Sequence, residues 1–141
     1  MSSSWALIEH DGSILLIRRA LERGRGGQWC LPGGTMWKNE SPAVACVRET
    51  FEETGLRVTI EKPLAIFKDA HYFLCQLNGS NQAVKLREEE AIDYRWLEPR
   101  HILSLGTIMD LRRLVPIMEH VGLQTPVLPQ TLKMAVPESL F

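Results

Sequence analysis

Three acidic residues lie close together in this sequence: Glu49, Glu52 and Glu53. The segment that contains them, residues 42–54, is predicted to be a helix, and residues three and four apart on a helix share one face. Like charges on adjacent turns repel each other, and the helix dipole disfavours anions near the C-terminal end, where these three stand. Divalent cations would remove this conflict, because carboxylate oxygens are ligands that Mg²⁺ and Mn²⁺ prefer. A solvated acidic surface is the alternative for so short a pattern.

Residues at both ends of this segment are typical of helix boundaries. Ser41 can cap the first turn, Pro42 suits the first helical position, and Gly55 suits the left-handed conformation that ends many helices. The side of the helix opposite the glutamates is predicted to seat the helix on the core. That side carries Ala43, Val44, Val47, Phe51 and Thr54.

The neighbours of the glutamates favour a functional site over a plain acidic surface. Gly33 and Gly34 precede the helix in a loop where backbone groups can approach a ligand closely. Arg48 can pair with one of the carboxylates and fix its rotamer, and Glu40 is another partner within its reach. Trp37 lies in the same loop, where stacking on a base, covering a pocket and plain packing are all open interpretations.

The spacing from Gly34 to Leu56 resembles the Nudix box: a Gly, five residues, a Glu, seven residues, then Arg-Glu and, two residues later, Glu-Glu. Thr50 stands in a slot that is usually aliphatic, and this single departure leaves every glutamate in place. The order of expected elements over residues 5–122 agrees with the family. The resemblance implies an α/β fold of the Nudix type, an α/β/α sandwich with a mixed β-sheet. It also implies hydrolysis of a nucleoside diphosphate linked to another group.

The resemblance also assigns roles to individual residues. The metal-binding groups it implies for Mg²⁺ or Mn²⁺ are one carbonyl and three carboxylates: Gly34, Glu49, Glu52 and Glu53. Arg48 and Glu40 are implied to support them. A general base must take a proton from the attacking water, and the sequence leaves three candidates open, Glu49, Glu52 and Glu90.

Two further segments bear on the substrate. The stretch Tyr94-Arg-Trp-Leu97, with Glu90 before it, resembles the corresponding part of dinucleoside polyphosphate hydrolases, and so does the position of Tyr72, sixteen residues after Leu56. Basic residues around the predicted site are candidates for holding phosphates by charge-assisted bonds, with surface solubility as the alternative. These are Arg18, Arg19, Arg23, Arg25 and Lys38.

We therefore predict a Mg²⁺-dependent pyrophosphohydrolase, with a dinucleoside polyphosphate as the favoured substrate. The first alternative is a house-cleaning enzyme for (oxidised) nucleoside triphosphates, and the second is a hydrolase of nucleotide sugars or ADP-ribose. The rival from another class is a non-catalytic nucleotide sensor. A sensor is expected to have lost box glutamates, and all of them are present here.

The elements that position these residues follow from apolar runs and turn signals. Asp11-Gly12 is typical of a hairpin turn between two strands. The glycine-rich residues 20–28 indicate a basic loop. The predicted strands are 5–8, 13–17, 29–31, one or two within 56–67 interrupted by Pro63, 71–77 and 94–97. A second helix is predicted over 107–121, and the tail at 124–141 is expected to be irregular.

Composition excludes several classes of protein. The 141 residues suit one domain, 1–141, and the net charge of −1 argues against a protein that holds duplex nucleic acid by its overall field. Three cysteines without a paired pattern favour a reducing cytoplasm, and neither a secretory signal nor a membrane span is predicted. A nucleotide is the expected partner, and the resemblance also allows a homodimer.

Overall fold

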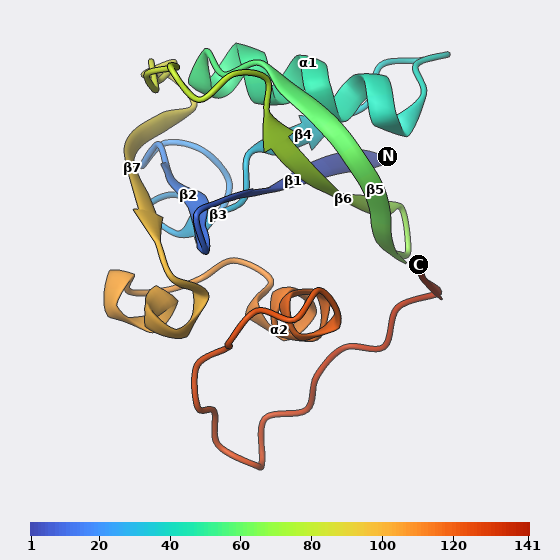
Figure 1. Ribbon diagram of the computed structural model, residues 1–141, viewed down its shortest axis with the longest axis vertical. Helices are drawn as coiled ribbons and strands as arrows, with labels where there is room; N and C mark the ends of the chain where they lie inside the picture. The colour runs from blue at the N-terminus through green and yellow to red at the C-terminus, as the bar shows by residue number, and fades with distance from the viewer.

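The computed structural model describes all 141 residues. A mixed sheet lies between two helices, α1 (Pro42–Thr54) on one side and α2 (Leu111–His120) on the other (Figure 1). The strands are β1 (Ser3–His10), β2 (Ser13–Arg19), β3 (Trp29–Cys30), β4 (Gly33–Thr35), β5 (Val58–Phe67), β6 (Ala70–Leu77), β7 (Ala91–Leu97) and β8 (Ser139–Leu140). The predicted α/β sandwich with a mixed sheet is confirmed.

Strand β1 joins the two parts of the sheet. Its first residues lie between β4, which is antiparallel to it, and β6, which is parallel. Its last two residues pair with β2, which in turn pairs with β3 and β7. The predicted hairpin turn is confirmed, because Asp11 and Gly12 both have positive φ, 51° and 79°. This arrangement brings the end of β2, strand β4 and the residue before β7 close to Glu49 of α1.

The boundaries of α1 are those predicted. The Ser41 side chain accepts a hydrogen bond from the Val44 N–H (3.2 Å), and Gly55 ends the helix with φ 73°. The predicted buried face is wrong for two residues, since Val44 and Phe51 are 57% and 42% exposed. The residues that face the sheet are Ala45, Cys46, Thr50, Glu53 and Thr54.

Small side chains explain which face of α1 is buried. Ala45 and Cys46 are fully buried and let the helix approach β1 and β4 closely. That orientation carries Glu53 into the interior, where it is 1% exposed and accepts a hydrogen bond from the protein backbone. A helical wheel that sorts residues by polarity alone misses this, because a hydrogen-bonded carboxylate can be buried.

Other predictions differ from the structure in detail. Gly33 and Gly34, expected in a loop, belong to strand β4, and the strand predicted over 94–97 begins at Ala91. Residues 56–67 contain a single strand, β5, in which the register shifts between Ile60 and Lys62 and again between Pro63 and Ala65. The second helix starts at Leu111 rather than 107, because Thr107 and Met109 form backbone hydrogen bonds with Trp29 of β3. A 3₁₀ helix, η1 (Pro99–Leu105), precedes it and was not predicted.

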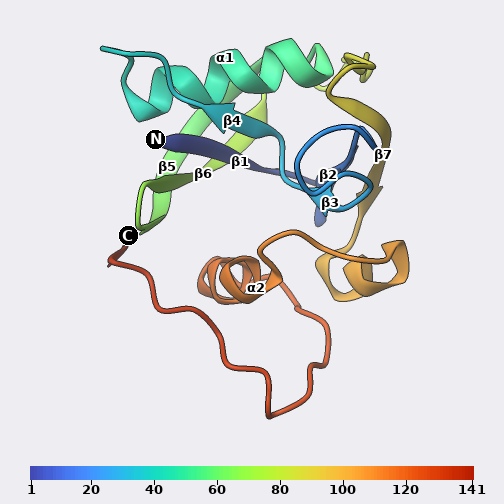
Figure 2. The same cartoon turned by 180° about the vertical axis from the view of Figure 1, so that it is seen from behind.

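The tail after residue 123 passes beneath α2 and returns to the sheet (Figure 2). It is irregular as predicted, except for β8, which pairs with Ala65 and Ile66 of β5. A backbone hydrogen bond from Ala135 to Arg112 fixes its middle. None of the helices combines the length and the apolar character that a membrane span requires.

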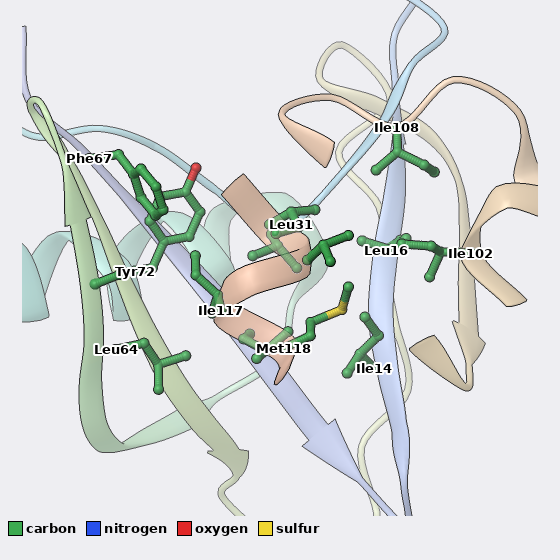
Figure 3. Packing of buried hydrophobic residues seen from close by; sticks show 14 of the residues in the cluster. Ile14, Leu16, Leu31, Leu64, Phe67, Tyr72, Ile102, Ile108, Ile117 and Met118 are labelled. Atoms are coloured by element: carbon green, nitrogen blue, oxygen red, sulfur yellow. The ribbon is translucent and has the colours of Figure 1, made fainter. Parts of the chain in front are cut away.

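The larger apolar core lies between the sheet and α2. Ile117 and Met118 of α2 are fully buried, and Figure 3 shows them among side chains of the sheet that include Leu16 and Leu64. A second cluster fills the space between the sheet and α1. Both helices are therefore held by apolar contacts, and the polar site lies at the edge of these layers.

We expect Ile117→Ala to lower the free energy of unfolding by about 2–5 kcal/mol, because it leaves a cavity in the core. Val127→Ala is the control, since Val127 is 97% exposed and its truncation should stay within about 0.5 kcal/mol. Urea unfolding followed by circular dichroism measures both. A loss below 1 kcal/mol for Ile117→Ala would contradict the packing of α2 described above.

Candidate active site

Arg48 is the centre of the predicted site, and all five of its N–H donors are used. Its Nε and Nη2 donate to the two oxygens of Glu40 (2.6 and 2.9 Å), and Nη2 also donates to the Thr35 carbonyl (3.1 Å). Nη1 donates to Glu49 Oε1 (3.0 Å) and to Glu52 Oε2 (3.1 Å). One guanidinium thus joins the loop before α1 to two carboxylates on consecutive turns of α1.

This arrangement leaves one oxygen on each of the two glutamates turned away from Arg48. Glu49 Oε2 reaches the space above Gly34, where a Cβ atom would lie 2.7 Å from it. A side chain at position 34 would therefore displace the carboxylate. Burial raises the pKa of Glu49, and the hydrogen bond from Arg48 opposes the rise. Glycine at position 34 is required here by space rather than by backbone conformation.

Glu53 occupies a different environment from the other two glutamates. Its Oε1 accepts a hydrogen bond from the Gly33 N–H (2.7 Å), and its Oε2 lies 3.5 Å from Arg23 Nη1. Burial raises the pKa of Glu53 to about 8, while the hydrogen bond from Gly33 works in the opposite direction. This carboxyl therefore fixes the start of β4 at Gly33 and ties the basic loop to α1.

Glu90 directly precedes β7 and is close enough to Glu49 and Glu53 for its charge to raise their pKa. Its carbonyl accepts hydrogen bonds from the Ala20 N–H (2.9 Å) and from Arg23 Nη1 (3.0 Å), so its backbone is well fixed. Its Oε2 is buried and has no hydrogen-bond partner. A buried carboxylate oxygen without a partner is costly, which suggests that something in the functional state binds it.

These donors fit a magnesium ion that is completed by substrate. No three acidic, histidine or cysteine side chains of the chain converge on one point that would hold an ion. Magnesium is usually bound by one or two carboxylates together with water and substrate phosphates, not by a cage of protein ligands. The free oxygens of Glu49 and Glu52 match that pattern.

A cleft of about 510 Å³ opens beside the glutamates, a size typical of small-molecule sites. Four arginines line it, and three of them come from the end of β2 and the basic loop after it: Arg19, Arg23, Arg25 and Arg113. Arg25 pairs with Asp110 across the cleft (3.1 Å). Apolar side chains line another part of the wall: Trp5, Ala70 and Met109. The cleft thus offers positive charge for phosphates and a flat apolar surface.

The structure brings only some of the predicted residues to this cleft. Those that line it are Arg19, Gly34, Glu49 and Glu90, together with Arg23 and Arg25. Glu52 and Arg48 do not line it, but the Arg48 hydrogen bonds join both residues to Glu49. Three predicted substrate-binding residues, Arg18, Lys38 and Tyr72, do not line it.

The positions of Arg18 and Tyr72 have clear causes. Arg18 Nε donates to the Gly27 carbonyl (3.0 Å), which holds the basic loop. Tyr72 is 3% exposed in the core beneath Arg113, against the ring of Phe67 (Figure 3). Burial raises the pKa of Tyr72 to about 12, and Arg113 opposes the rise. Lys38 has no such contact and lies in the loop before α1.

The far wall of the cleft could not be predicted from the sequence. Asp110 and Arg113 lie about sixty residues after the box, in a segment whose spacing resembles any amphipathic helix. Trp5 and Met109 are isolated apolar residues in the sequence. The packing of α2 against the sheet brings Asp110 and Arg113 to the site, whereas the pairing of β1 with β4 places Trp5 beside Gly33.

Comparison with known proteins agrees with this geometry. The sequence model of the NUDIX domain matches residues 3–116. The chain belongs to the Nudix family. This Nudix protein is therefore a hydrolase of phosphoric anhydride bonds, as the box predicted.

Two curated relatives and one solved structure illustrate the likeness of this Nudix protein. A "MutT-like protein" of Streptomyces ambofaciens is 32% identical over 86% of this chain and 79% of that protein. The "CTP pyrophosphohydrolase" of Escherichia coli K12 is 32% identical over 79% of this chain and 93% of that protein. The crystal structure of a MutT protein from Methanosarcina mazei Go1 has a TM-score of 0.65 and 29% identity, covering 84% of this chain and 90% of that one.

The raised pKa of Glu53 predicts a pH-dependent stability. The folded protein keeps a proton that the unfolded chain, with a carboxyl pKa of about 4.3, has released, so this group's contribution to stability falls as the pH rises to about 8. Glu53→Gln removes this term and keeps the acceptor for the Gly33 N–H. We expect its stability relative to wild type to increase by up to about 1.4 kcal/mol per pH unit between pH 5 and 8.

Urea unfolding at pH 5, 6.5 and 8 in the presence of a chelator measures this difference. Glu89→Gln is the control, because Glu89 is exposed and should show no such trend. A difference between Glu53→Gln and wild type that stays constant with pH would show that Glu53 is not protonated in the folded protein.

Proposed function

We propose that this protein is a Mg²⁺-dependent pyrophosphohydrolase of nucleoside triphosphates, which includes oxidised ones. The observation that carries the proposal is the pairing of Glu49 and Glu52 on Arg48, at the side of a cleft lined by four arginines. The negative charge of a triphosphate would match both parts of this site, the arginines of the cleft and a metal ion held by the two glutamates. The curated relative named CTP pyrophosphohydrolase, which this chain covers almost completely, supports the same class.

The residues that would hold the metal are Glu49 and Glu52, through the oxygens that Arg48 leaves free, with the Gly34 carbonyl beside them. A bound divalent cation supplies charge neutralisation on the phosphates and lowers the pKa of a bound water. The protein's part is to keep these oxygens in position before substrate arrives. Arg48 holds them by hydrogen bonds that are already formed, so little reorganisation is needed when the substrate binds.

The chain's own groups then bind the substrate and accept the proton. Arg19, Arg23 and Arg25 are positioned to contact phosphate oxygens, because all three line the cleft. We assign Glu90 as the general base, since its Oε2 is buried, lacks a hydrogen-bond partner and can take the proton of the attacking water. Glu49 and Glu52 already share their charge with Arg48.

The nucleoside would lie against the apolar part of the cleft. Trp5, Ala70 and Met109 offer flat or small apolar surface, and Asp110 lies beside them with an acceptor for base N–H groups.

The three cysteines are buried free thiols, which supports a reducing compartment and so the cytoplasm.

A dinucleoside polyphosphate is the second candidate substrate. Glu90 lines the cleft at the position that the resemblance to dinucleoside polyphosphate hydrolases indicated, which favours it. Tyr72, the other residue behind that prediction, lies in the core and not in the cleft. We therefore give the nucleoside triphosphate priority.

A panel of substrates tests this choice. We expect kcat/KM with Mg²⁺ to be highest for a nucleoside triphosphate and lower for a dinucleoside tetraphosphate and for ADP-ribose, measured by chromatography of the nucleotide products. Nucleoside monophosphate and pyrophosphate are the expected products from the triphosphate. A clear preference for the dinucleotide would replace our proposal by the second candidate.

Two substitutions separate metal binding from proton transfer. Glu52→Gln should weaken Mn²⁺ binding in calorimetry and lower kcat by several orders of magnitude, because a carboxylate ligand is lost. Glu90→Gln should lower kcat by about 10²–10⁴-fold, as expected for loss of a general base. Unchanged activity of Glu90→Gln would remove Glu90 from the mechanism, and unchanged Mn²⁺ affinity of Glu52→Gln would remove Glu52 from the metal site.

A further inference from the structure

Trp37 is a large aromatic residue that the reaction described above does not use. It lies in the loop between β4 and α1, is 60% exposed, and does not line the cleft. Its ring stacks on the guanidinium of Arg48, whose carbon lies 3.7 Å from the ring centroid. The structure therefore gives no support to one interpretation that the sequence left open, stacking of Trp37 on a base in this cleft.

The stacking completes the restraint on Arg48. The five N–H donors of the guanidinium lie in its plane and are all bonded, so its edges are fixed by Glu40, Glu49, Glu52 and Thr35. A planar cation held only at its edges still has an open face, where water can compete for the hydrogen bonds. The indole of Trp37 covers one such face, and Arg48 is only 14% exposed.

We propose that Trp37 is a positioning residue for the metal site: by stacking on Arg48 it keeps the free oxygens of Glu49 and Glu52 in place. This inference rests on the metal role of those two glutamates under the proposed function. The action of Trp37 is indirect, through one arginine, and requires a π face rather than apolar bulk.

The backbone of residue 37 makes its own contribution, which separates cleanly from that of the ring. The Trp37 N–H donates to Glu40 Oε1 (2.8 Å), and its carbonyl accepts from the Glu40 N–H (3.1 Å). A side-chain substitution at position 37 keeps both bonds. Any effect on Arg48 is then an effect of the indole.

The first measurement needs neither metal nor substrate. Hydrogen exchange of the Arg48 Nε–H with water is followed by NMR, with the signal assigned from its loss in Arg48→Lys. We expect Trp37→Ala to speed this exchange at least about threefold, because an aromatic ring on a partly desolvated cation is lost. Trp37→Phe should keep the exchange within about twofold of wild type, since a benzene ring also has a π face.

The second measurement is the affinity for Mn²⁺ by calorimetry without nucleotide. We expect it to weaken about 3–10-fold in Trp37→Ala and to recover in Trp37→Phe. Trp37→Leu is the matched control, because leucine offers apolar bulk without a π face and should behave like alanine. Weaker metal binding should also lower the activity of Trp37→Ala, and a higher Mg²⁺ concentration should restore it.

Three results would overturn the inference: unchanged exchange in Trp37→Ala, faster exchange with unchanged Mn²⁺ affinity, or Trp37→Leu restoring both as well as Trp37→Phe. Failure of the proposed function looks different. In that case wild type hydrolyses no nucleotide with Mg²⁺, while Trp37→Ala still weakens Mn²⁺ binding, and the positioning role of Trp37 stands.

Discussion

The guanidinium of Arg48 is the interaction on which the rest of this site depends. It accounts for the presence of like charges at the end of a helix, where the helix dipole and mutual repulsion both disfavour them. It donates hydrogen bonds to one oxygen of Glu49 and one oxygen of Glu52, which neutralises part of their charge and fixes both rotamers. The remaining oxygens are then available on a rigid support, which suits phosphoryl chemistry that relies on positioning and charge stabilisation.

The fold around Arg48 serves this arrangement in several ways. Glu40 and Thr35 hold the arginine from the loop before α1, and the small residues on the buried face of α1 let the helix lie close to β1 and β4. Glu53 is not a surface charge: it is buried and joins Gly33, at the start of β4, to Arg23 of the basic loop. Three neighbouring glutamates thus have unequal environments, and only two of them share Arg48.

How far the sequence predicts the site depends on the range of the contacts. The box is local, so the helix limits, the Gly34 approach and the Arg48–Glu40 pair could be predicted from spacing alone. The buried face of α1 could not, because burial of Glu53 depends on a backbone N–H from another element. Asp110 and Arg113 could not be predicted either, since their place in the cleft is created by the packing of α2 against the sheet. Tyr72 lies in a strand as predicted, but only the fold determines that its side chain points into the core.

We expect a divalent cation to bind between the phosphates of a nucleotide and the oxygens of Glu49 and Glu52 that Arg48 leaves free. Anomalous scattering from a crystal grown with Mn²⁺ and a non-hydrolysable nucleoside triphosphate tests it most directly. We expect a manganese peak in contact with both glutamates and with the phosphate chain. A nucleotide bound in the cleft with no manganese at these two side chains would contradict the claim.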